Sequence, residues 1–144
     1  KIYGLAALRL GWAYGPANVI DAIHRVRGPF NVSAPAQAAG AAAIGDQAFV
    51  DQSVAYNTAE GDRVASGLAE LGLEAVPGVA NFVLIRFTSP NDVASADAFL
   101  RSRNLVLRRL DAYGLPDCIR LTIGPKEANT AVLEALAAWK DTHV

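Results

Sequence analysis

Along residues 47–72, one series of positions recurs in alternating steps of four and three. The series consists of Val50, Val54, Asn57, Gly61, Val64, Leu68 and Leu71. This spacing places the series on one face of a long helix, and Gly72 is a typical residue with which to end it. Gly61 lowers helix propensity by about 1 kcal/mol relative to alanine, so we expect it to permit close packing of that face.

The residues before this helix are mostly apolar and predict a strand followed by helices. The run "LRLGWAYG" predicts a buried strand that stops at Gly15 and Pro16. Residues 16–26 predict a helix, because Pro16 can begin one and several apolar residues share one face. That face would consist of Val19, Ile20, Ile23 and Val26. In the loop that follows, Ser33 can cap a further helix whose first turn tolerates Pro35.

From Leu73 onward, apolar and polar residues alternate over short stretches, as is typical of strands. The predicted elements are, in order, strands at 73–76 and 81–87 joined by a turn at 77–80, a helix at 89–103, strands at 105–109 and 118–123, and a helix that opens at Gly124 and Pro125. The inner face of this last helix would carry Val132, Leu136 and Trp139. The order predicts a compact α/β layer with its helices on one side of the sheet.

The composition is that of a soluble globular chain. Of its 144 residues 52% are hydrophobic, and the formal net charge is -1. Because charge is nearly balanced and no apolar run is long enough to span a bilayer, we predict no nucleic-acid partner and no membrane partner. Cys118 is the only cysteine, which excludes an internal disulfide and a cysteine-only metal site, and we predict no metal. A reducing, cytoplasmic setting fits these features best.

The charges are unevenly distributed along the chain and suggest two domains. Residues 1–45 carry four lysines and arginines against one acid, Asp21, and the acids gather from Asp46 onward. We therefore predict one domain at 1–45 and another at 46–144. The chain begins at a lysine and contains no methionine, so we expect it to be the back part of a longer protein or a processed product.

Two cations near the start of the chain are candidates for chemistry. Lys1 directly precedes a short turn that contains glycine. A lysine becomes a nucleophile where its surroundings lower its pKa, and elsewhere it is a solvated surface charge. Arg9 interrupts an apolar run, and a guanidinium there needs a partner, which is either a bidentate anion such as phosphate or a buried carboxylate. The residues by themselves leave these alternatives open.

The segment "KIYGLAALRLGW" resembles the lysine segment of the type I pyridoxal-phosphate aminotransferases. The matching residues are Lys1, Gly4, Leu5, Leu8, Arg9, Gly11 and Trp12. The resemblance implies pyridoxal 5'-phosphate as the cofactor, with Lys1 binding it as a Schiff base and moving a proton in catalysis, and with Arg9 gripping its phosphate. It also implies the α/β fold of the type I transferases. Residues 1–45 would then complete the large cofactor domain, and 46–144 would form a connecting helix and the small domain.

The segment "CIRLTIG" resembles the histidinol-phosphate aminotransferase branch of that family. In this branch the strand arginine binds the substrate carboxylate, a role that falls to Arg120. An arginine after the preceding hydrophobic strand binds the substrate phosphate. By its position in the resemblance this is Arg108. The adjacent Arg109 is disfavoured, because neighbouring residues of a strand face opposite ways. Without the resemblance, Arg108 would be an ordinary solvated charge on an edge strand. Tyr113 and Gly114 lie in the loop between the two arginines, where they could touch substrate, but we assign them no role.

The resemblance covers essentially the whole chain and implies a reaction. An amino group would pass between L-histidinol phosphate and 2-oxoglutarate, giving imidazole-acetol phosphate and glutamate, in histidine biosynthesis. The family is homodimeric, so a second copy is the expected partner. The alternatives are an aromatic amino acid aminotransferase or a phosphothreonine decarboxylase of the same fold, or a non-catalytic anion-binding α/β module. The family spacing of Lys1 and Arg9 counts against the module.

Overall fold

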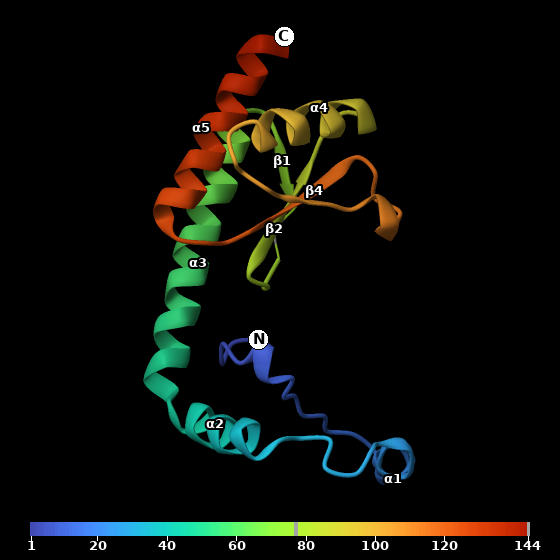
Figure 1. Ribbon diagram of the computed structural model, residues 1–144. Coiled ribbons are helices and arrows are strands. Elements are labelled where there is room, and N and C mark those ends of the chain that lie inside the picture. Colours follow the sequence, from blue (N-terminus) through green and yellow to red (C-terminus); the bar gives the residue numbers. More distant parts are fainter. Residues whose placement is uncertain (77, 144) are drawn as a thin grey trace. The chain divides into compact units, whose positions relative to one another are not determined.

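The structure is a computed structural model that describes residues 1–76 and 78–143. The chain divides into two compact units, Lys1–Val54 and Ala55–Val144. The long helix α3, Gln47–Glu70, contributes to both of them (Figure 1). The division into domains at 1–45 and 46–144 stays a prediction. Within the described part of the chain, no helix combines the length and the apolar character that crossing a membrane requires.

The first unit contains helical elements before α3. They are the 3-10 helix η1 at Ala6–Leu8 and the α-helices α1 at Ala17–Val26 and α2 at Ala34–Gly45. Pro16 directly precedes α1, as predicted, because the fixed φ of proline suits the start of a helix. The predicted cap of α2 is also confirmed, since the Ser33 hydroxyl accepts a hydrogen bond from the Ala36 backbone N–H at 3.3 Å.

The buried strand predicted for "LRLGWAYG" is wrong. Beyond η1 these residues form no regular element, and Trp12 and Tyr14 are 78% and 95% exposed. Arg9 has a φ of 54°, which lies outside the range of any strand. A strand is stabilised by hydrogen bonds to a neighbouring strand, and the described residues of the first unit form none. The apolar run is therefore irregular chain.

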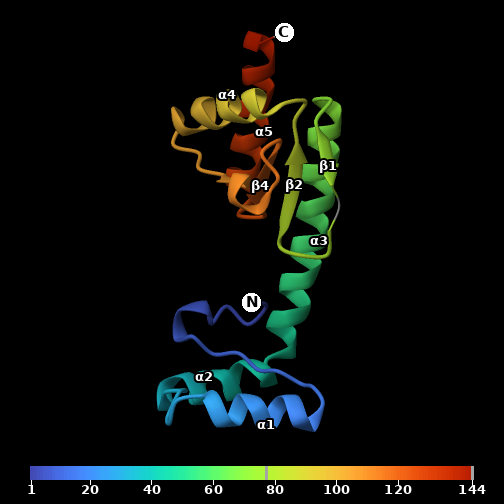
Figure 2. The ribbon, with the colours of Figure 1, turned by 90° about the vertical axis from the view of Figure 1, so that its right-hand side faces the viewer.

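The second unit is built on a four-stranded sheet. Its elements after α3 are β1 at Glu74–Val76, β2 at Phe82–Arg86, α4 at Pro90–Arg101, β3 at Arg108–Arg109, η2 at Asp111–Tyr113, β4 at Cys118–Thr122 and α5 at Lys126–His143. The strands are antiparallel in the order β1-β2-β4-β3 (Figure 2). The predicted order of strands and helices is confirmed, although only the end of the strand predicted at 105–109 forms. The predicted turn includes Pro77, which lies outside the described residues.

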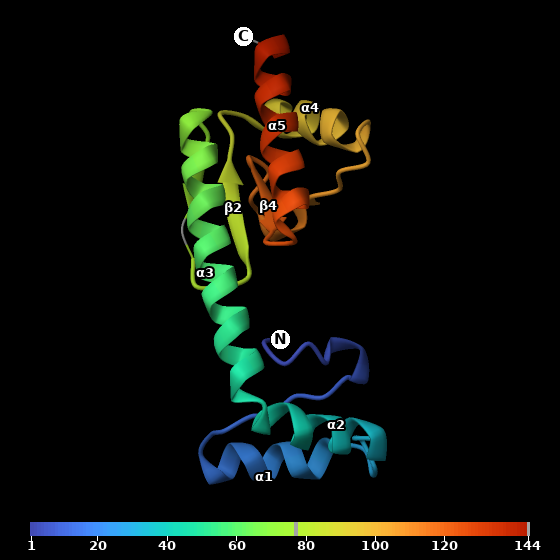
Figure 3. The same cartoon turned by 90° about the vertical axis from the view of Figure 1, so that its left-hand side faces the viewer.

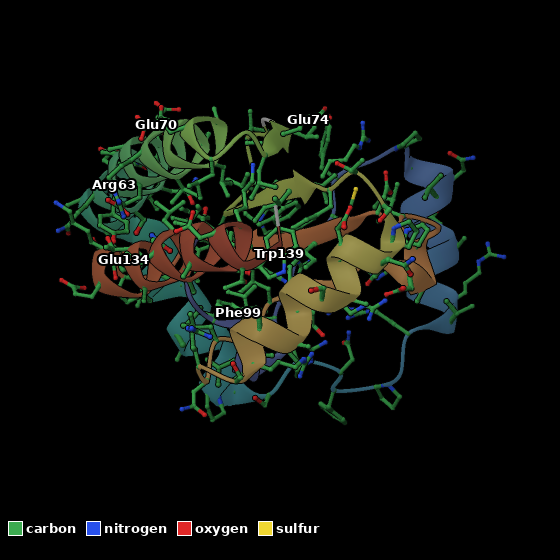
Figure 4. The ribbon with its side chains drawn as sticks, turned by 90° about the horizontal axis from the view of Figure 1, so that it is seen from above. Arg63, Glu70, Glu74, Phe99, Glu134 and Trp139 are labelled. Atoms are coloured by element: carbon green, nitrogen blue, oxygen red, sulfur yellow. The ribbon has the colours of Figure 1, made fainter. Side chains whose placement is uncertain are left out.

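One face of this sheet forms the core of the second unit. Its inward residues on the two inner strands are Val83, Ile85, Ile119 and Leu121. Residues paired across strands point to the same side, and this side packs against α3, α4 and α5 in one apolar cluster (Figure 3). Trp139 of α5 lies beside α4 (Figure 4), and its indole N–H donates to the Ser95 hydroxyl at 3.0 Å. The predicted placement of the helices on one side of the sheet is confirmed.

The buried face of α3 follows only the later part of the predicted series, where Val64 and Leu68 are fully buried, whereas Val54 is 51% exposed. Gly72 follows the helix with a φ of +67°, which glycine adopts at no steric cost. The role predicted for Gly61 is wrong, because a Cβ there would meet no atom of the described residues within 4 Å. Gly67 is the glycine that permits close packing, since a Cβ there would stand 2.9 Å from Leu133 Cδ1 of α5. The helices therefore approach one another further along α3 than the pattern indicated.

A buried polar network joins α3 to the start of α5. Glu60 accepts two hydrogen bonds from Arg63, at 2.8 and 2.9 Å, and one from the Asn129 amide at 2.9 Å. Asn129 is only 1% exposed and also bonds the N–H and the carbonyl of Gly124. The hydrogen bonds from Arg63, and then from Asn129, lower the pKa of Glu60 from 4.5 to about 2. The ionised carboxylate thus holds α3, α5 and the loop before α5 together.

Replacing Glu60 with glutamine is expected to lower Tm by a few degrees near neutral pH and to have a smaller effect in acid. The pKa of Glu60 is lower in the folded state than in the unfolded state, so its contribution to stability is complete above about pH 4.5 and is lost as pH falls toward about 2. Thermal unfolding followed by circular dichroism at several pH values measures this difference. Glu70→Gln, at an exposed position of the same helix, is the control. A Tm difference between Glu60→Gln and the parent that does not change with pH would contradict the prediction.

Candidate functional site

Lys1 begins a tight turn that leads to Arg9. The Gly4 backbone N–H donates to the Lys1 carbonyl at 3.1 Å, and Gly4 has a φ of +67°, where a residue without Cβ is favoured. The helix η1 follows, and Arg9 ends it in the left-handed conformation. An arginine adopts that conformation rarely and at a cost of about 1–3 kcal/mol. Such strain is typical of residues whose position matters for function.

A cavity of about 660 Å³ in the first unit is lined by both Lys1 and Arg9. Apolar side chains including Leu10 and Trp12 form part of its wall, and α2 contributes Gly40. A Cβ at Gly40 would overlap the Leu10 side chain, so the absence of a side chain there allows Leu10 to pack directly on α2. The two predicted cofactor residues thus share one cavity, which the packing of Leu10 on α2 helps to shape.

The cavity is cationic and offers no counter-charge from the described residues. The Arg9 guanidinium donates to the Ala6 carbonyl at 3.1 Å. Among the described residues, no carboxylate lies within ion-pair distance of Lys1 or Arg9. Of the two partners open to Arg9, the buried carboxylate is therefore not found in this part of the chain. An amine and a guanidinium in one cavity form a donor set that suits an anionic group next to an electrophilic carbon.

The second pair of candidate residues lies on the sheet face opposite the core. Arg108 of β3 stands directly across from Arg120 of β4, so both side chains leave the sheet on the same face. Arg109 pairs with Ile119 and belongs to the other face. Its guanidinium donates to Asp111 at 2.7 and 3.0 Å, which lowers the pKa of Asp111. Arg109 is thus neutralised by a neighbour of its own.

A second cavity, of about 590 Å³, is lined by both Arg108 and Arg120. Residues 104–107, the end of β4 and the first turns of α5 complete its wall. The Arg120 guanidinium lies 5.0 Å from the centre of the Phe82 ring, and its Nε finds no hydrogen-bond partner among the described residues. Within the described part of the chain, neither arginine has a carboxylate at ion-pair distance. Two like charges on opposed residues repel, so an anionic ligand bound between Arg108 and Arg120 would reduce their repulsion.

Asn129 belongs to the wall of this cavity, Tyr113 contacts one of its arginines, and Cys118 lies two residues before the other. Asn129 lines it and is a residue that the sequence pattern alone did not single out. Its position one turn before Val132 places it on the inner face of the helix. That position could have identified it, because a polar residue among buried positions must find hydrogen-bond partners. Tyr113 accepts a hydrogen bond from Arg108 at 2.8 Å. Cys118 is fully buried, and burial raises the pKa of its thiol, which makes it a poor nucleophile.

Metal binding finds no support in the described residues, which contain no group of three or more histidines, cysteines or acids that could hold an ion.

The family of the chain follows from its sequence as a whole. The sequence model of the family described as aminotransferase class I and II matches residues 1–136. The chain belongs to this family. The resemblance of the lysine segment to the aminotransferases is thereby confirmed, and it extends over both units of the structure.

Similar curated proteins include two that are named histidinol-phosphate aminotransferase. The protein from Rhodopseudomonas palustris is 54% identical over 138 residues, which are 94% of this chain and 38% of that protein. The protein from Nitrobacter hamburgensis is 52% identical over 138 residues, again 94% of this chain and 38% of the relative. The chain therefore spans less than two fifths of the length of these curated relatives.

Solved structures confirm the predicted fold class. The histidinol-phosphate aminotransferase from Sinorhizobium meliloti, described as a complex with pyridoxal 5'-phosphate, has a TM-score of 0.90 at 24% identity and covers 100% of this chain and 40% of that one. The enzyme of the same name from Clostridium acetobutylicum has a TM-score of 0.87 at 23% identity, covering 99% of this chain and 44% of that one. At such low identities these likenesses show the fold alone, which is the aminotransferase fold predicted from the lysine segment.

Proposed function

We propose that the chain is the C-terminal part of an aminotransferase that moves an amino group between L-histidinol phosphate and 2-oxoglutarate, giving imidazole-acetol phosphate and glutamate, in histidine biosynthesis. The observation that carries this proposal is the opposed pair of arginines, Arg108 and Arg120, in one cavity. Two guanidiniums without counter-charge match a substrate with a doubly charged phosphate. The relatives of that name, at 52% and 54% identity, support the same reaction.

The cofactor proposed for this reaction is pyridoxal 5'-phosphate, with which the Sinorhizobium meliloti enzyme of the same fold forms a complex. The cavity of the first unit fits it, because Lys1 supplies an amine and Arg9 a guanidinium there. Lys1 would hold the cofactor covalently and carry a proton to and from the reacting carbon of the substrate, and Arg9 would bind the cofactor phosphate. When bound, the cofactor supplies an electron sink for bond breaking at the amino-bearing carbon.

The two arginines of the second unit would bind the substrates. L-Histidinol phosphate carries a phosphate and no carboxylate, whereas glutamate carries carboxylates and no phosphate. Both substrates exchange their amino group at one site in turn, so its cations must accept either anion. We assign the carboxylate of glutamate to Arg120 and the phosphate of L-histidinol phosphate to Arg108. Because Arg120 stands directly opposite Arg108, it would contribute to binding both anions. Arg108, on the outer strand β3, would then contribute mainly to the phosphorylated substrate.

We also propose that the protein acts as a homodimer. The apolar face of α1 is largely uncovered, with Val19, Ile23 and Val26 exposed, and Phe30 in the next loop is 99% exposed. Apolar surface of this kind indicates contact with further protein, which a second copy and the remaining part of the aminotransferase would supply. We also propose a cytoplasmic setting, which rests on the composition of the chain.

The proposed reaction is tested with purified full-length protein loaded with pyridoxal 5'-phosphate. L-Histidinol phosphate, an aromatic amino acid and phosphothreonine are each supplied with 2-oxoglutarate, and glutamate and carbon dioxide are measured. We expect the fastest glutamate formation with L-histidinol phosphate. A faster reaction with the aromatic amino acid, or carbon dioxide release from phosphothreonine, would assign the protein to one of the alternatives of the same fold. A protein that takes up no cofactor would be the anion-binding module.

Replacing Arg108 with alanine is expected to weaken the phosphorylated substrate selectively. Losing hydrogen bonds between a guanidinium and a phosphate costs about 2–3 kcal/mol, or roughly a 30- to 150-fold rise in KM for L-histidinol phosphate. KM for glutamate should change much less. Steady-state kinetics of both half-reactions measure the two values. Arg103→Ala, which removes an exposed arginine that stacks on Phe99, is the control. Equal losses for the two substrates would contradict the assignment of Arg108.

A further inference from the structure

Tyr113 is placed against the guanidinium of Arg108. Arg108 Nη2 donates to the Tyr113 hydroxyl oxygen at 2.8 Å, and the guanidinium carbon lies 5.4 Å from the centre of the tyrosine ring. The tyrosine is 61% exposed, so burial does not hold it in place. Its position follows instead from the hydrogen bond and from the attraction between a cation and an aromatic face.

The loop between β3 and β4 fixes the backbone from which Tyr113 projects. The Tyr113 N–H donates to the Leu110 carbonyl at 2.9 Å, and the Gly114 N–H donates to the Asp111 carbonyl at 3.0 Å. Gly114 ends η2 with a φ of +73°, which suits glycine. The ion pair of Arg109 with Asp111 braces the same turn. With the backbone held at these points, the contact between Tyr113 and Arg108 fixes the two side chains relative to each other.

The direction of the hydrogen bond leaves the tyrosine with a free donor. The guanidinium has donors only, so the phenol oxygen accepts, and the phenol's own hydrogen must point to a different acceptor. Among the described residues, no acceptor lies at hydrogen-bond distance from it. Accepting a bond from a cation also polarises the O–H group and strengthens it as a donor. Arg108 and Tyr113 together therefore present a fork of N–H donors and one O–H donor.

This donor set distinguishes a phosphate from a carboxylate. A carboxylate has two oxygens, and one guanidinium fork can satisfy both of them. A phosphate monoester has three terminal oxygens and about two charges, so it has an oxygen left for the phenol after the fork is occupied. The O–H of Tyr113 would thus add binding energy for a phosphorylated substrate and little for glutamate.

We propose that Tyr113 is a specificity-determining residue, which orients Arg108 and donates its hydroxyl hydrogen to the phosphate of the substrate. This inference rests on the proposed function and deepens it, because it explains how one site favours a phosphorylated amine over an amino acid. It assigns a chemical role to the loop between β3 and β4. If Tyr113 served only to stabilise this loop, Tyr113→Phe would leave substrate preference unchanged, because the ring and its contact with the Arg108 guanidinium remain.

The test is the Tyr113→Phe variant of the full-length protein loaded with pyridoxal 5'-phosphate. We expect KM for L-histidinol phosphate to rise about ten-fold, as for the loss of one hydrogen bond to a charged group. The kcat value and KM for glutamate should stay within about two-fold, because the fork of Arg108 remains. Inorganic phosphate, used as a competitive inhibitor, should weaken in parallel with L-histidinol phosphate. An unchanged ratio of the two KM values would overturn the inference.

Two further variants keep this inference separate from the proposed function. Tyr56→Phe also removes one phenol hydroxyl, which donates to the Gly124 carbonyl at 3.0 Å, and it should lower Tm without changing the KM ratio. In the Arg108→Ala background, Tyr113→Phe should have a much smaller effect, because the residues act as a unit. If Arg108→Ala shifts the ratio and Tyr113→Phe does not, the inference fails and the function stands. If neither shifts it, the assignment of the phosphate to this loop fails, and the inference fails with it.

Discussion

Replacing Lys1 with alanine is expected to abolish amino transfer, lowering kcat by at least about 1,000-fold. In the proposed reaction the Lys1 amine has two tasks, since it holds the cofactor and moves a proton at the reacting carbon, and alanine can perform neither. Lys1 has no ion-pair partner among the described residues, so its removal should leave the fold intact. Glutamate formation from L-histidinol phosphate and 2-oxoglutarate measures the loss, and the visible absorbance of protein-bound cofactor reports the missing covalent bond.

Two other variants show whether the amine itself is required. Lys1→Arg retains a positive charge at the same cavity, but a guanidinium stays protonated and cannot act as the amine does, so it should be as inactive as Lys1→Ala. Lys126→Ala removes an exposed lysine at the start of α5 and should leave kcat unchanged. Substantial amino transfer by Lys1→Ala would contradict the assignment and return Lys1 to the class of solvated surface charges.

The second unit was predictable from sequence because its strands and helices bury their apolar faces against one another within the unit. The spacing of Val64 and Leu68 marked the buried face of α3, and alternation in β2 and β4 marked the residues that meet it. Local pattern and tertiary packing agree in such a unit, as they do in sequences that fold uniquely. The prediction that Gly61 permits close packing, which the structure assigns to Gly67, shows the limit of this agreement. A helical series identifies the buried face, but the point of closest approach depends on the partner helix, and Leu133 of α5 selects Gly67.

The first unit was less predictable because many of its large apolar side chains are exposed within the described chain. Trp12 and Tyr14 form part of an apolar run, and such a run cannot by itself show which partner covers it. The chain spans 38% of the curated relatives it matches, and we propose that the remaining protein covers these residues. Helix α1 was predicted correctly because Pro16 and a 3.6-residue period act locally, whereas a strand depends on a neighbour.

The candidate site shows the same division between local and non-local information. The resemblance assigned the phosphate to Arg108 by its position, and strand alternation placed Arg109 on the other face. The register then sets Arg108 opposite Arg120. The part played by Tyr113 could not be predicted in this way. The sequence places it five residues after Arg108, but the contact depends on how η2 folds the loop back on the strand. Residues that act through another side chain are visible only once that geometry is known.

Replacing Arg120 with alanine is expected to impair both half-reactions, in contrast to Arg108→Ala. Arg120 lies on the inner strand β4, opposite Arg108, and we assign it a share in binding both the carboxylate of glutamate and the phosphate of L-histidinol phosphate. Removing one partner of a desolvated charge pair costs about 2–4 kcal/mol, or roughly 30- to 1,000-fold in kcat/KM. Steady-state kinetics with each substrate measure the loss, and Arg120→Lys should recover part of it because it restores the charge without the fork.

The effect of the same substitution on stability separates binding from structure. Arg120 faces another arginine, and like charges opposed on neighbouring strands destabilise a sheet by about 0.2–1 kcal/mol. Its contact with the Phe82 ring contributes a similar amount of about 0.5–1 kcal/mol in the opposite sense. These contributions nearly cancel, so Tm of the Arg120→Ala variant should remain close to that of the parent while activity collapses. A large fall in Tm would show that Arg120 stabilises the sheet, and an unchanged kcat/KM for glutamate would show that it does not bind the carboxylate.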